Sequence, residues 1–567
     1  MYTDIITVIL IFVCSIAAAY PLGRYISHVF KGEPVFTDFL KPLEERIFHY
    51  AGIDALHEMG WVENSMALLR INSFFFIFAF LVLIFQGETG LLNPANIASM
   101  DPYLAFHTAV SFVTNTNLQH YSGEVNLSYL SQIVVVCFLQ FVSAASGIAV
   151  FALLLVGLVK RHSKGMGNFY LFFVRSVTRI LLPLSLVMAV LLILAGSPNN
   201  YSPPVQHNGL EQDSITVAMG PVATITSIKQ IGTNGGGYYG ANSAHPFENP
   251  NSITNFLENF AILLLPMALV FTFGFYLNRI RMSILFFGVM TLLFIVFATG
   301  AIGIESAGNP HVAQTGISQP QGNMEGKETR FGSVLSALWG VSTTSTSNGS
   351  VNSMLDSHIP GAGAIYMVDM MINAIYGGVG VGMLNFFLFI IVAAFIAGLM
   401  VGRTPEFLGK KIEAKEIKIA ALVILLHPIL ILTGTAISSY VASVNPGTGW
   451  ISGSSFHGFS QMLYEFTSAA ANNGSGFEGL GDNTVFWNLT TAVVMLLGRY
   501  IPIIGPLAIA GSLASKNTVP ESEGTLDTSG LAFGVILSGV IIVIAALSFF
   551  PALTLGPIAE YLSLLRG

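Results

Sequence analysis

The sequence is poor in charged residues and in cysteine, and both shortages limit what the chain can be. Only 9% of its 567 residues are charged, while 53% are hydrophobic; soluble globular proteins carry roughly a quarter charged residues. With a net charge of −7, the chain cannot assemble the basic face that nucleic-acid binding needs. The two cysteines, Cys14 and Cys137, lie inside apolar runs, where we expect core residues rather than a disulfide or metal ligands. The composition therefore indicates a membrane protein without a nucleic-acid partner.

Motifs for nucleotide chemistry are also missing. The chain contains no GxxxxGK[ST] and no Asp-Lys-Thr-Gly, the phosphorylated motif of ion-pumping ATPases. Gly235-x-Gly237-x-x-Gly240 formally matches a dinucleotide fingerprint, but it follows no predicted strand, so we treat the match as accidental. We therefore predict a noncatalytic chain that binds no nucleotide.

Ten apolar runs are long enough to cross a membrane, which takes roughly 20 residues each. The first run has Asp4 rather than a basic residue at its start, so we expect a retained helix with its N-terminus outside rather than a signal peptide. The fold class predicted is an all-α membrane protein with about ten transmembrane helices. The runs fall near 5–23, 65–86, 128–158, 169–195, 253–277, 283–303, 364–400, 417–440, 485–512 and 528–550.

Positive charge supports this topology, because cytoplasmic connections collect Lys and Arg. An N-terminus outside and ten spans place both termini outside. The basic loop 403–418 also offers a docking surface for a cytoplasmic partner. The predicted cytoplasmic turns hold Lys160, Arg161, Lys164, Arg279, Arg281, Arg403, Lys410, Lys411, Lys415 and Lys418, and the outer segments hold only Lys229, Lys327, Arg330 and Arg566.

Four outer connections contain apolar segments that are too short to span a membrane. They lie at 101–113, about 216–231, about 329–344 and 458–470. A helix of about 13–16 residues is roughly 20–24 Å long, so we interpret the segments as re-entrant half-helices surrounded by protein or by a pore. The alternative is that they lie on the outer surface as amphipathic turns.

A polar cluster follows each half-helix, and the clusters repeat. When Asn117, Asn234, Asn348 and Asn473 are taken as equivalent, the separations are 117, 114 and 125 residues. This period predicts four units, each with a span, a half-helix, a polar loop and a second span, around one pore. An extra helix lies at each end of the chain. The predicted divisions are 1–60, 61–160, 161–282, 283–415, 416–515 and 516–567.

Four polar loops that meet at one axis can replace the water shell of an alkali cation with backbone carbonyls. Glycine permits the backbone angles that turn carbonyls inward, and the C-terminal ends of the half-helices add partial negative charge. No acidic side chain is needed, so the chemistry favours a monovalent, weakly hydrated cation. The glycines concerned are Gly235, Gly236, Gly349 and Gly474.

Several long motifs resemble the KdpA family, the potassium-transporting component of the Kdp P-type pump. They are TNTNLQ, TNGGGYYGANSAHPFENP, the glycine-rich 376–382 and GRTPEFLGKKIE at 402–413, and the likeness covers essentially the whole chain. The resemblance implies that Gln119 lies near the outer mouth and tunes affinity. It also implies filter roles for Thr114, Asn115, Thr116, Asn117, Gly232, Thr233, Asn234, Gly235, Gly236, Ser345, Thr346, Ser347, Asn348, Gly349, Ala471, Asn472, Asn473 and Gly474.

The resemblance further implies high-affinity uptake of K⁺ across a bacterial plasma membrane, with K⁺ leaving sideways toward a separate ATP-hydrolysing P-type subunit. It implies a periplasmic chaperone-like subunit, a small single-span peptide and membrane lipid as further partners. Two alternatives stay open: a self-sufficient channel or ion-coupled symporter of the same superfamily, and a membrane scaffold that conducts nothing.

Arg499 stands in the middle of an apolar span. A cation at a helix centre costs about 2.5–3.5 kcal/mol on insertion scales, so we expect it to face the protein interior or a wet cavity. There it would limit backward leak or push K⁺ sideways, and the resemblance places an arginine of this kind at the pore. The alternative is a buried ion pair that joins helices.

The glycine-rich stretch 375–382 interrupts the apolar run 364–400. Glycines weaken a helix by up to about 1 kcal/mol each, so we predict an unwound loop beneath the filter that could act as a gate; the alternative is close helix packing. Asp369 and Asn373, one turn apart, are expected beside the same cavity, and Asp369 is expected to draw the ion off the filter. The glycines are Gly377, Gly378, Gly380 and Gly382.

Overall fold

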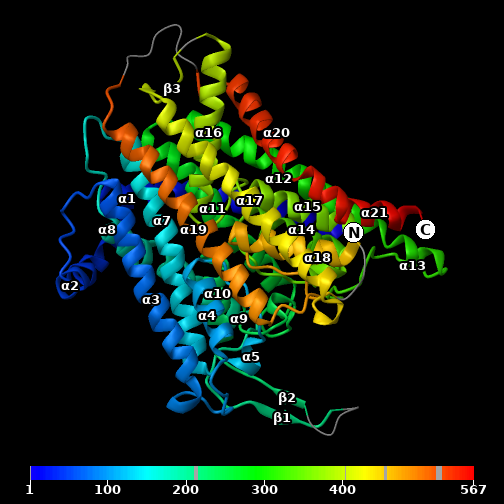
Figure 1. Ribbon diagram of the computed structural model, residues 1–567. Coiled ribbons are helices and arrows are strands. Elements are labelled where there is room, and N and C mark those ends of the chain that lie inside the picture. Colours follow the sequence, from blue (N-terminus) through cyan, green and yellow to red (C-terminus); the bar gives the residue numbers. More distant parts are fainter. Residues whose placement is uncertain (1, 210–214, 403, 452–455, 519–526, 567) are drawn as a thin grey trace.

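The computed structural model describes the chain except residues 1, 210–214, 403, 452–455, 519–526 and 567. Among the described helices, ten are long and apolar enough to cross a membrane, which confirms the predicted number. Figure 1 shows them as one inclined bundle. The spans are formed by α1 (Tyr2–Lys31), α3 (Trp61–Thr89), α6 with α7 (Tyr129–Ser131 and Phe138–Val159), α8 with α9 (Phe169–Arg175 and Leu182–Leu194), α11 (Ser252–Leu277), α12 (Ile280–Ala307), α16 (Val381–Met400), α17 (Ala414–Val444), α19 (Val485–Ala514) and α20 (Leu531–Leu555).

Polar side chains define where several spans begin. Asn168 accepts hydrogen bonds from the backbone N–H of Tyr170 and Leu171 at the start of α8, and Asn251 caps α11 in the same way. Such caps satisfy amide groups that have no partner inside the helix. Two composite spans contain one π-helical turn each, at Gln132–Cys137 and Ser176–Leu181.

The four predicted half-helices are present and buried. They are α4 (Pro102–Val113), α10 (Val222–Ile231), α14 (Gly332–Ser345) and α18 (Phe456–Ala471). Trp339 in α14 and Tyr464 in α18 are fully buried, so these helices do not lie on the outer surface. The second begins later than expected, because Ile215–Val217 pairs as β2 with β1 (Val205–His207).

The half-helices are packed in a closed cycle. Each contacts the two spans of its own unit, and each also contacts the second span of the preceding unit: α10 meets α7, α14 meets α11, α18 meets α15 (Pro360–Ile372) and α4 meets α19. The last contact joins the fourth unit to the first. Four units with this connectivity enclose one axis, as an internal repeat predicts.

The predicted span 364–400 is broken. Helix α15 ends at Ile372 and α16 begins at Val381. The connecting loop contains residues with positive φ, among them Asn373 at 47° and Tyr376 at 59°. The predicted unwound loop is therefore confirmed, although Gly382 belongs to α16 rather than to the loop.

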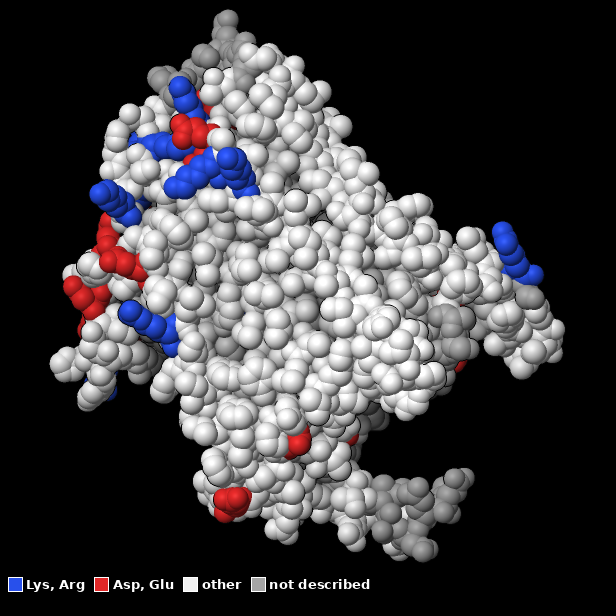
Figure 2. Space-filling model, viewed as in Figure 1, with Lys and Arg blue, Asp and Glu red and all other residues white. Residues whose placement is uncertain are grey.

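The remaining elements are short and lie at the two ends of the bundle. Figure 2 shows Lys and Arg gathered at the upper left of the visible face, near β3 and the start of α3, and an uncharged middle. Arg403, one of the cations predicted to lie in the cytoplasmic turns, lies outside the described residues. The short elements are α2 (Lys41–Ala51), α5 (Gly123–Asn126), α13 (Pro310–Gln314), α21 (Pro557–Arg566), β3 (Glu406–Phe407) and β4 (Lys410–Lys411).

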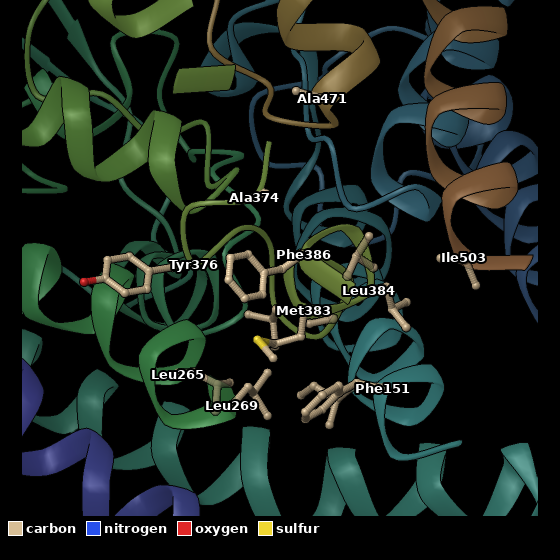
Figure 3. Close-up of a cluster of buried hydrophobic side chains, with 14 of the residues drawn as sticks. Phe151, Leu265, Leu269, Ala374, Tyr376, Met383, Leu384, Phe386, Ala471 and Ile503 are labelled. Atoms are coloured by element: carbon tan, nitrogen blue, oxygen red, sulfur yellow. The ribbon is translucent and has the colours of Figure 1, made fainter. Parts of the chain in front are cut away.

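Beyond the loop of the broken span, the interior is apolar. Figure 3 shows Met383, Leu384 and Phe386 of α16 among Phe151 of α7 and Leu265 of α11. All five side chains are at most 1% exposed. Close packing of this kind leaves little room for water, so the polar groups of the interior are concentrated on the half-helix side of the loop.

Candidate ion filter

The segment after each half-helix alternates in backbone handedness. Positive φ occurs first at Asn115, Thr233, Ser347 and Asn472, and again two residues later at Asn117, Gly235, Gly349 and Gly474. Alternation of this kind turns successive N–H groups to one side of the chain and successive carbonyls to the other. The four segments therefore share one backbone conformation despite their different sequences.

This conformation corrects the predicted alignment of the first segment. Thr116, rather than Asn117, is equivalent to Asn234, Asn348 and Asn473, because Asn117 has the positive φ, 55°, that glycine has in the other three segments. Asparagine is one of the few residues that tolerate a left-handed backbone. The prediction matched asparagine to asparagine and therefore aligned the first segment with the other three one residue out of register.

The four segments contact one another in a ring. A methyl group on Gly235 would lie 2.0 Å from the carbonyl oxygen of Asn348, which joins the second segment to the third. A methyl group on Gly349 would lie 2.2 Å from the carbonyl oxygen of Asn473, so the third segment contacts the fourth. A methyl group on Gly474 would lie 1.9 Å from the carbonyl oxygen of Thr116, so the fourth segment contacts the first.

Hydrogen bonds close the ring between the first and second segments. The amide Nδ2 of Asn115 donates to the Thr233 carbonyl at 2.9 Å, and Nδ2 of Asn234 donates to Oδ1 of Asn115 at 2.6 Å. Elsewhere in the ring, Asn472 donates to Thr116 Oγ1 at 2.9 Å. The predicted filter residues are thus brought together, and their side chains fix the backbone from behind.

Several backbone carbonyls of the described segments are left without a donor, and at one equivalent position this holds in all four. Among the described residues, no hydrogen bond reaches the backbone oxygens of Thr116, Asn234, Asn348 or Asn473. Buried carbonyls are nearly always paired, so four equivalent exceptions call for an explanation. A dehydrated cation on the axis supplies one, because it needs a ring of such oxygens.

A buried charged network stands behind the second segment, and sequence reasoning missed it. Lys229 Nζ is ion-paired with Glu248 and donates to Asn242 Oδ1 at 2.9 Å. Asn242 Nδ2 donates to the carbonyl of Gly235 at 2.7 Å, and Gln140 Nε2 donates to that of Gly236 at 2.8 Å. From the sequence, Lys229 was assigned only as an outer cation. Its position just before TNGGGYYGANSAHPFENP, which contains its partners, was the sequence feature that could have indicated the network.

Gln119 joins the first segment to the second. Its Oε1 accepts from the Gly237 N–H at 2.9 Å, and its Nε2 donates to the Gly237 carbonyl and to the Tyr121 hydroxyl, both at 3.2 Å. Both ends of the amide are occupied by protein groups. Gln119 therefore connects the second segment to Tyr121.

Asp369 is bound to the end of the third half-helix. Its Oδ2 accepts from the Thr344 hydroxyl at 2.8 Å and from the Ser345 hydroxyl at 2.6 Å. Its Oδ1 has no partner among the described residues. The neighbouring Asn373 accepts from Ser347 Oγ at 3.0 Å, so both residues touch the third segment.

The glycine-rich loop lies directly against the second and third segments. The backbone N–H of Val379 donates to Thr233 Oγ1 at 3.0 Å, and a methyl group on Gly378 would lie 3.6 Å from Ser347 Cβ. Gly380 also packs on Gly147 of α7: a methyl group added to Gly380 would lie 2.1 Å from the carbonyl oxygen of Gly147. The loop is thus unwound and closely packed at the same time.

Arg499 lies beside this loop in α19. It is 4% exposed and forms no ion pair with a described residue, so the ion-pair alternative is wrong for this part of the chain. Its Nη2 donates to the Ser143 carbonyl at 3.4 Å and lies 3.3 Å from a methyl group placed on Gly147, the residue against which Gly380 packs. An unbalanced positive charge therefore stands next to the loop.

A cavity opens on the other side of the loop. Its volume is about 50 Å³, and α15, α16, α17, α19 and α20 surround it. Four polar side chains, Asn373, Asn385, His427 and Ser548, line it among apolar residues. Because Asn373 also touches the third segment, the cavity begins next to the ring.

The fold and the ring define a multi-pass membrane protein built from four half-helix units around one axis. The chain belongs to the KdpA family, described as potassium-transporting ATPase A subunit, which matches residues 9–562.

Curated relatives match the chain along its whole length. Those from Flavobacterium johnsoniae and Bacteroides fragilis are 52% and 50% identical, with all of each chain covered. One from Geobacillus kaustophilus is 47% identical over 98% of both chains. All three are named potassium-transporting ATPase potassium-binding subunit. Among solved structures, the potassium transporter TrkH from Vibrio parahaemolyticus has a TM-score of 0.49 and 15% identity, with 75% of this chain and 83% of that one covered.

Proposed function

We propose that the chain is the potassium-binding and translocating subunit of an ATP-driven uptake pump. The observation that carries the proposal is the closed ring of four segments, which all have a buried carbonyl at the same position that accepts no hydrogen bond from the described residues. Potassium sheds its water at such a ring because the carbonyls replace its hydration shell. The names of the relatives, which bind potassium and belong to an ATPase, agree with this chemistry.

In this proposal the predicted filter residues have two roles. The backbone oxygens of Thr116, Asn234, Asn348 and Asn473 face the ion. Their neighbours position these oxygens by hydrogen bonds or by left-handed backbone, and Gln119 sets the outer side of the ring. The divisions 61–160, 161–282, 283–415 and 416–515 are the four repeats that carry one segment each.

Potassium enters from outside and leaves sideways. Two observations support this route over a straight one: α16 packs on α7 and α11 through apolar side chains beyond the loop (Figure 3), and the cavity that begins at Asn373 lies to one side. The loop containing Gly377, Gly378 and Gly380 acts as the gate. Arg499 beside it repels a cation that continues along the axis, and Asp369 favours its departure from the ring.

The partner that receives the ion is a separate ATP-hydrolysing P-type subunit, since this chain lacks the phosphorylation motif. A periplasmic chaperone-like subunit, a small single-span peptide and membrane lipid complete the surroundings. We place the complex in the bacterial plasma membrane with both termini of this chain outside. The collection of cations at one end of the bundle supports that orientation (Figure 2).

Ion binding to the purified chain tests the proposal. Potassium and rubidium are expected to bind, sodium much more weakly, and ammonium in between, because a carbonyl ring selects by size and hydration. Gly235→Asp places a carboxylate against the Asn348 carbonyl and is expected to abolish the preference. Equal binding of all four ions before and after the change contradicts the filter, and rapid potassium flux through the chain alone in liposomes contradicts the role in a pump.

A further inference from the structure

A second group of ligand atoms lies on the outer side, apart from the ring. It consists of His120, in the loop after the first segment, Glu465 in α18, and Asp482, in the loop before α19. His120 Nε2 lies 3.1 Å from Glu465 Oε1 and 3.9 Å from Asp482 Oδ2, and the three ligand atoms are all within 4.8 Å of one another. His120 and Glu465 are buried, while the Asp482 side chain is 31% exposed.

Hydrogen bonds fix which nitrogen of His120 faces the carboxylates. Nδ1 lies 2.7 Å from Asn488 Oδ1, and Asn488 points this oxygen at the ring because its Nδ2 donates to Asn483 Oδ1 at 3.2 Å. Nδ1 is therefore the N–H donor. In the neutral ring, the lone pair of Nε2 then faces two carboxylates, an arrangement that is stable only with a cation between them. A hydrogen-bond acceptor on the far nitrogen is also how metal-binding histidines are oriented.

A buried imidazole without partners lies beside this group. The His107 ring stacks on His120 with the two ring centroids 3.8 Å apart. His107 is fully buried, and neither of its nitrogens has a hydrogen-bond partner among the described residues. Buried polar groups are rarely left this way without an ion or water nearby. The three converging ligand atoms mark the site, and the unpartnered His107 ring packs against it.

We propose that His120, Glu465 and Asp482 bind one divalent transition-metal ion, with zinc as the ion that best fits the ligands. Imidazole with carboxylate suits zinc rather than magnesium or calcium, which prefer all-oxygen ligands. Zinc–ligand bonds of about 2.0–2.2 Å at the tetrahedral angle place neighbouring ligands about 3.3–3.6 Å apart. The His120–Glu465 distance of 3.1 Å has to open slightly to reach this range, and the more exposed Asp482, at 3.9 Å, has to approach by rotating. The ion joins the loop behind the first segment to the half-helix of the fourth.

Another histidine with two carboxylates shows what the site is not. His457 Nε2 faces Asp356 Oδ1 at 3.3 Å and Nδ1 faces Glu560 Oε1 at 2.8 Å, so each nitrogen has a carboxylate of its own. The two carboxylates lie on opposite sides of the ring, and a doubly protonated imidazole satisfies both. His457 is therefore a matched control, because it is also a histidine with two acidic neighbours.

The test measures zinc bound by the purified full-length chain. After treatment with chelator, the protein is incubated with Zn²⁺, freed of excess metal and analysed by mass spectrometry for zinc per chain. The wild type and His457→Gln are expected to retain one equivalent, whereas Asp482→Asn and His120→Gln bind at least tenfold more weakly. Zn²⁺ is also expected to raise the melting temperature of the wild type and of His457→Gln but not of Asp482→Asn. The partly exposed position of Asp482 keeps that variant informative if His120→Gln does not fold.

Two results overturn the proposal. One is a wild type that retains no zinc above background, which leaves a proton as the cation among these residues. The other is equal retention of zinc by the wild type and by Asp482→Asn, which places the metal elsewhere.

Discussion

Replacing Gly235 with alanine should weaken potassium binding without unfolding the protein. The new methyl group would lie 2.0 Å from the Asn348 carbonyl oxygen and 2.7 Å from the carbonyl carbon of Gly349. Carbon and oxygen atoms that are not bonded do not approach closer than about 3 Å. The second and third segments must therefore separate by about 1 Å, in the ring where their spacing determines which ion fits.

The change to alanine has two separate effects, one on the stability of the fold and one on potassium binding. The first is the left-handed backbone at Gly235, where φ is +84°; for alanine this conformation costs about 1–2 kcal/mol. The second is the displacement of the carbonyl. A 1 Å misplacement in a site that depends on geometry costs on the order of a hundredfold in its function, so we expect potassium affinity to fall by about that factor.

Gly449→Ala separates the two costs. Gly449 has φ of +66° and nothing within 4 Å of an added methyl group, so this change carries the backbone cost alone. Both variants are assayed for potassium binding by calorimetry and for melting temperature, in the same detergent. Gly235→Ala is expected to lose affinity with a modest drop in melting temperature, and Gly449→Ala to show only the modest drop. Equal potassium affinities in the two variants would refute the reasoning.

Three further changes probe the surroundings of the ring. Lys229→Met leaves the buried Glu248 without its cation, so we expect a loss of about 3–5 kcal/mol, seen as a much lower melting temperature; an unchanged value contradicts the network. Arg499→Gln removes the charge beside the loop and is expected to increase potassium leak through the assembled complex at unchanged affinity, with equal leak as the contrary result. Hydrogen bonds that the His457 ring donates to Asp356 and Glu560 raise the pKa of His457 to about 10 from 6.5. Its contribution to the stability of the fold is therefore complete below pH 6.5 and is lost as pH rises toward 10. The difference in melting temperature between wild type and His457→Gln should therefore be larger at pH 6 than at pH 9.5, and a difference that grows with pH is the opposite result.

Local patterns predicted most of the architecture. Apolar runs located all ten spans because each helix must be about as long as the bilayer is thick, and glycine density located the break between α15 and α16. The repeat of polar clusters brought together the right segments, since each cluster follows a half-helix at a similar spacing.

What the sequence did not predict depends on conformation or on contacts between distant residues. The register of the first segment was wrong by one residue because Asn117 takes the backbone conformation that glycine takes elsewhere. The Lys229 network and the group around His120 join residues from separate helices and loops, such as His120 and Asp482. No periodicity links such positions; for the Lys229 network the neighbouring motif was a signal, whereas only the packed structure brings His120 and Asp482 together.

The central claim is that four equivalent carbonyls hold one dehydrated potassium ion. The most direct measurement is an experimental structure of the chain with thallium or rubidium in place of potassium, with the heavy ion located by its anomalous scattering. We predict a peak equidistant from the backbone oxygens of Thr116, Asn234, Asn348 and Asn473. A peak elsewhere, or none at an ion concentration that saturates binding, would contradict the claim.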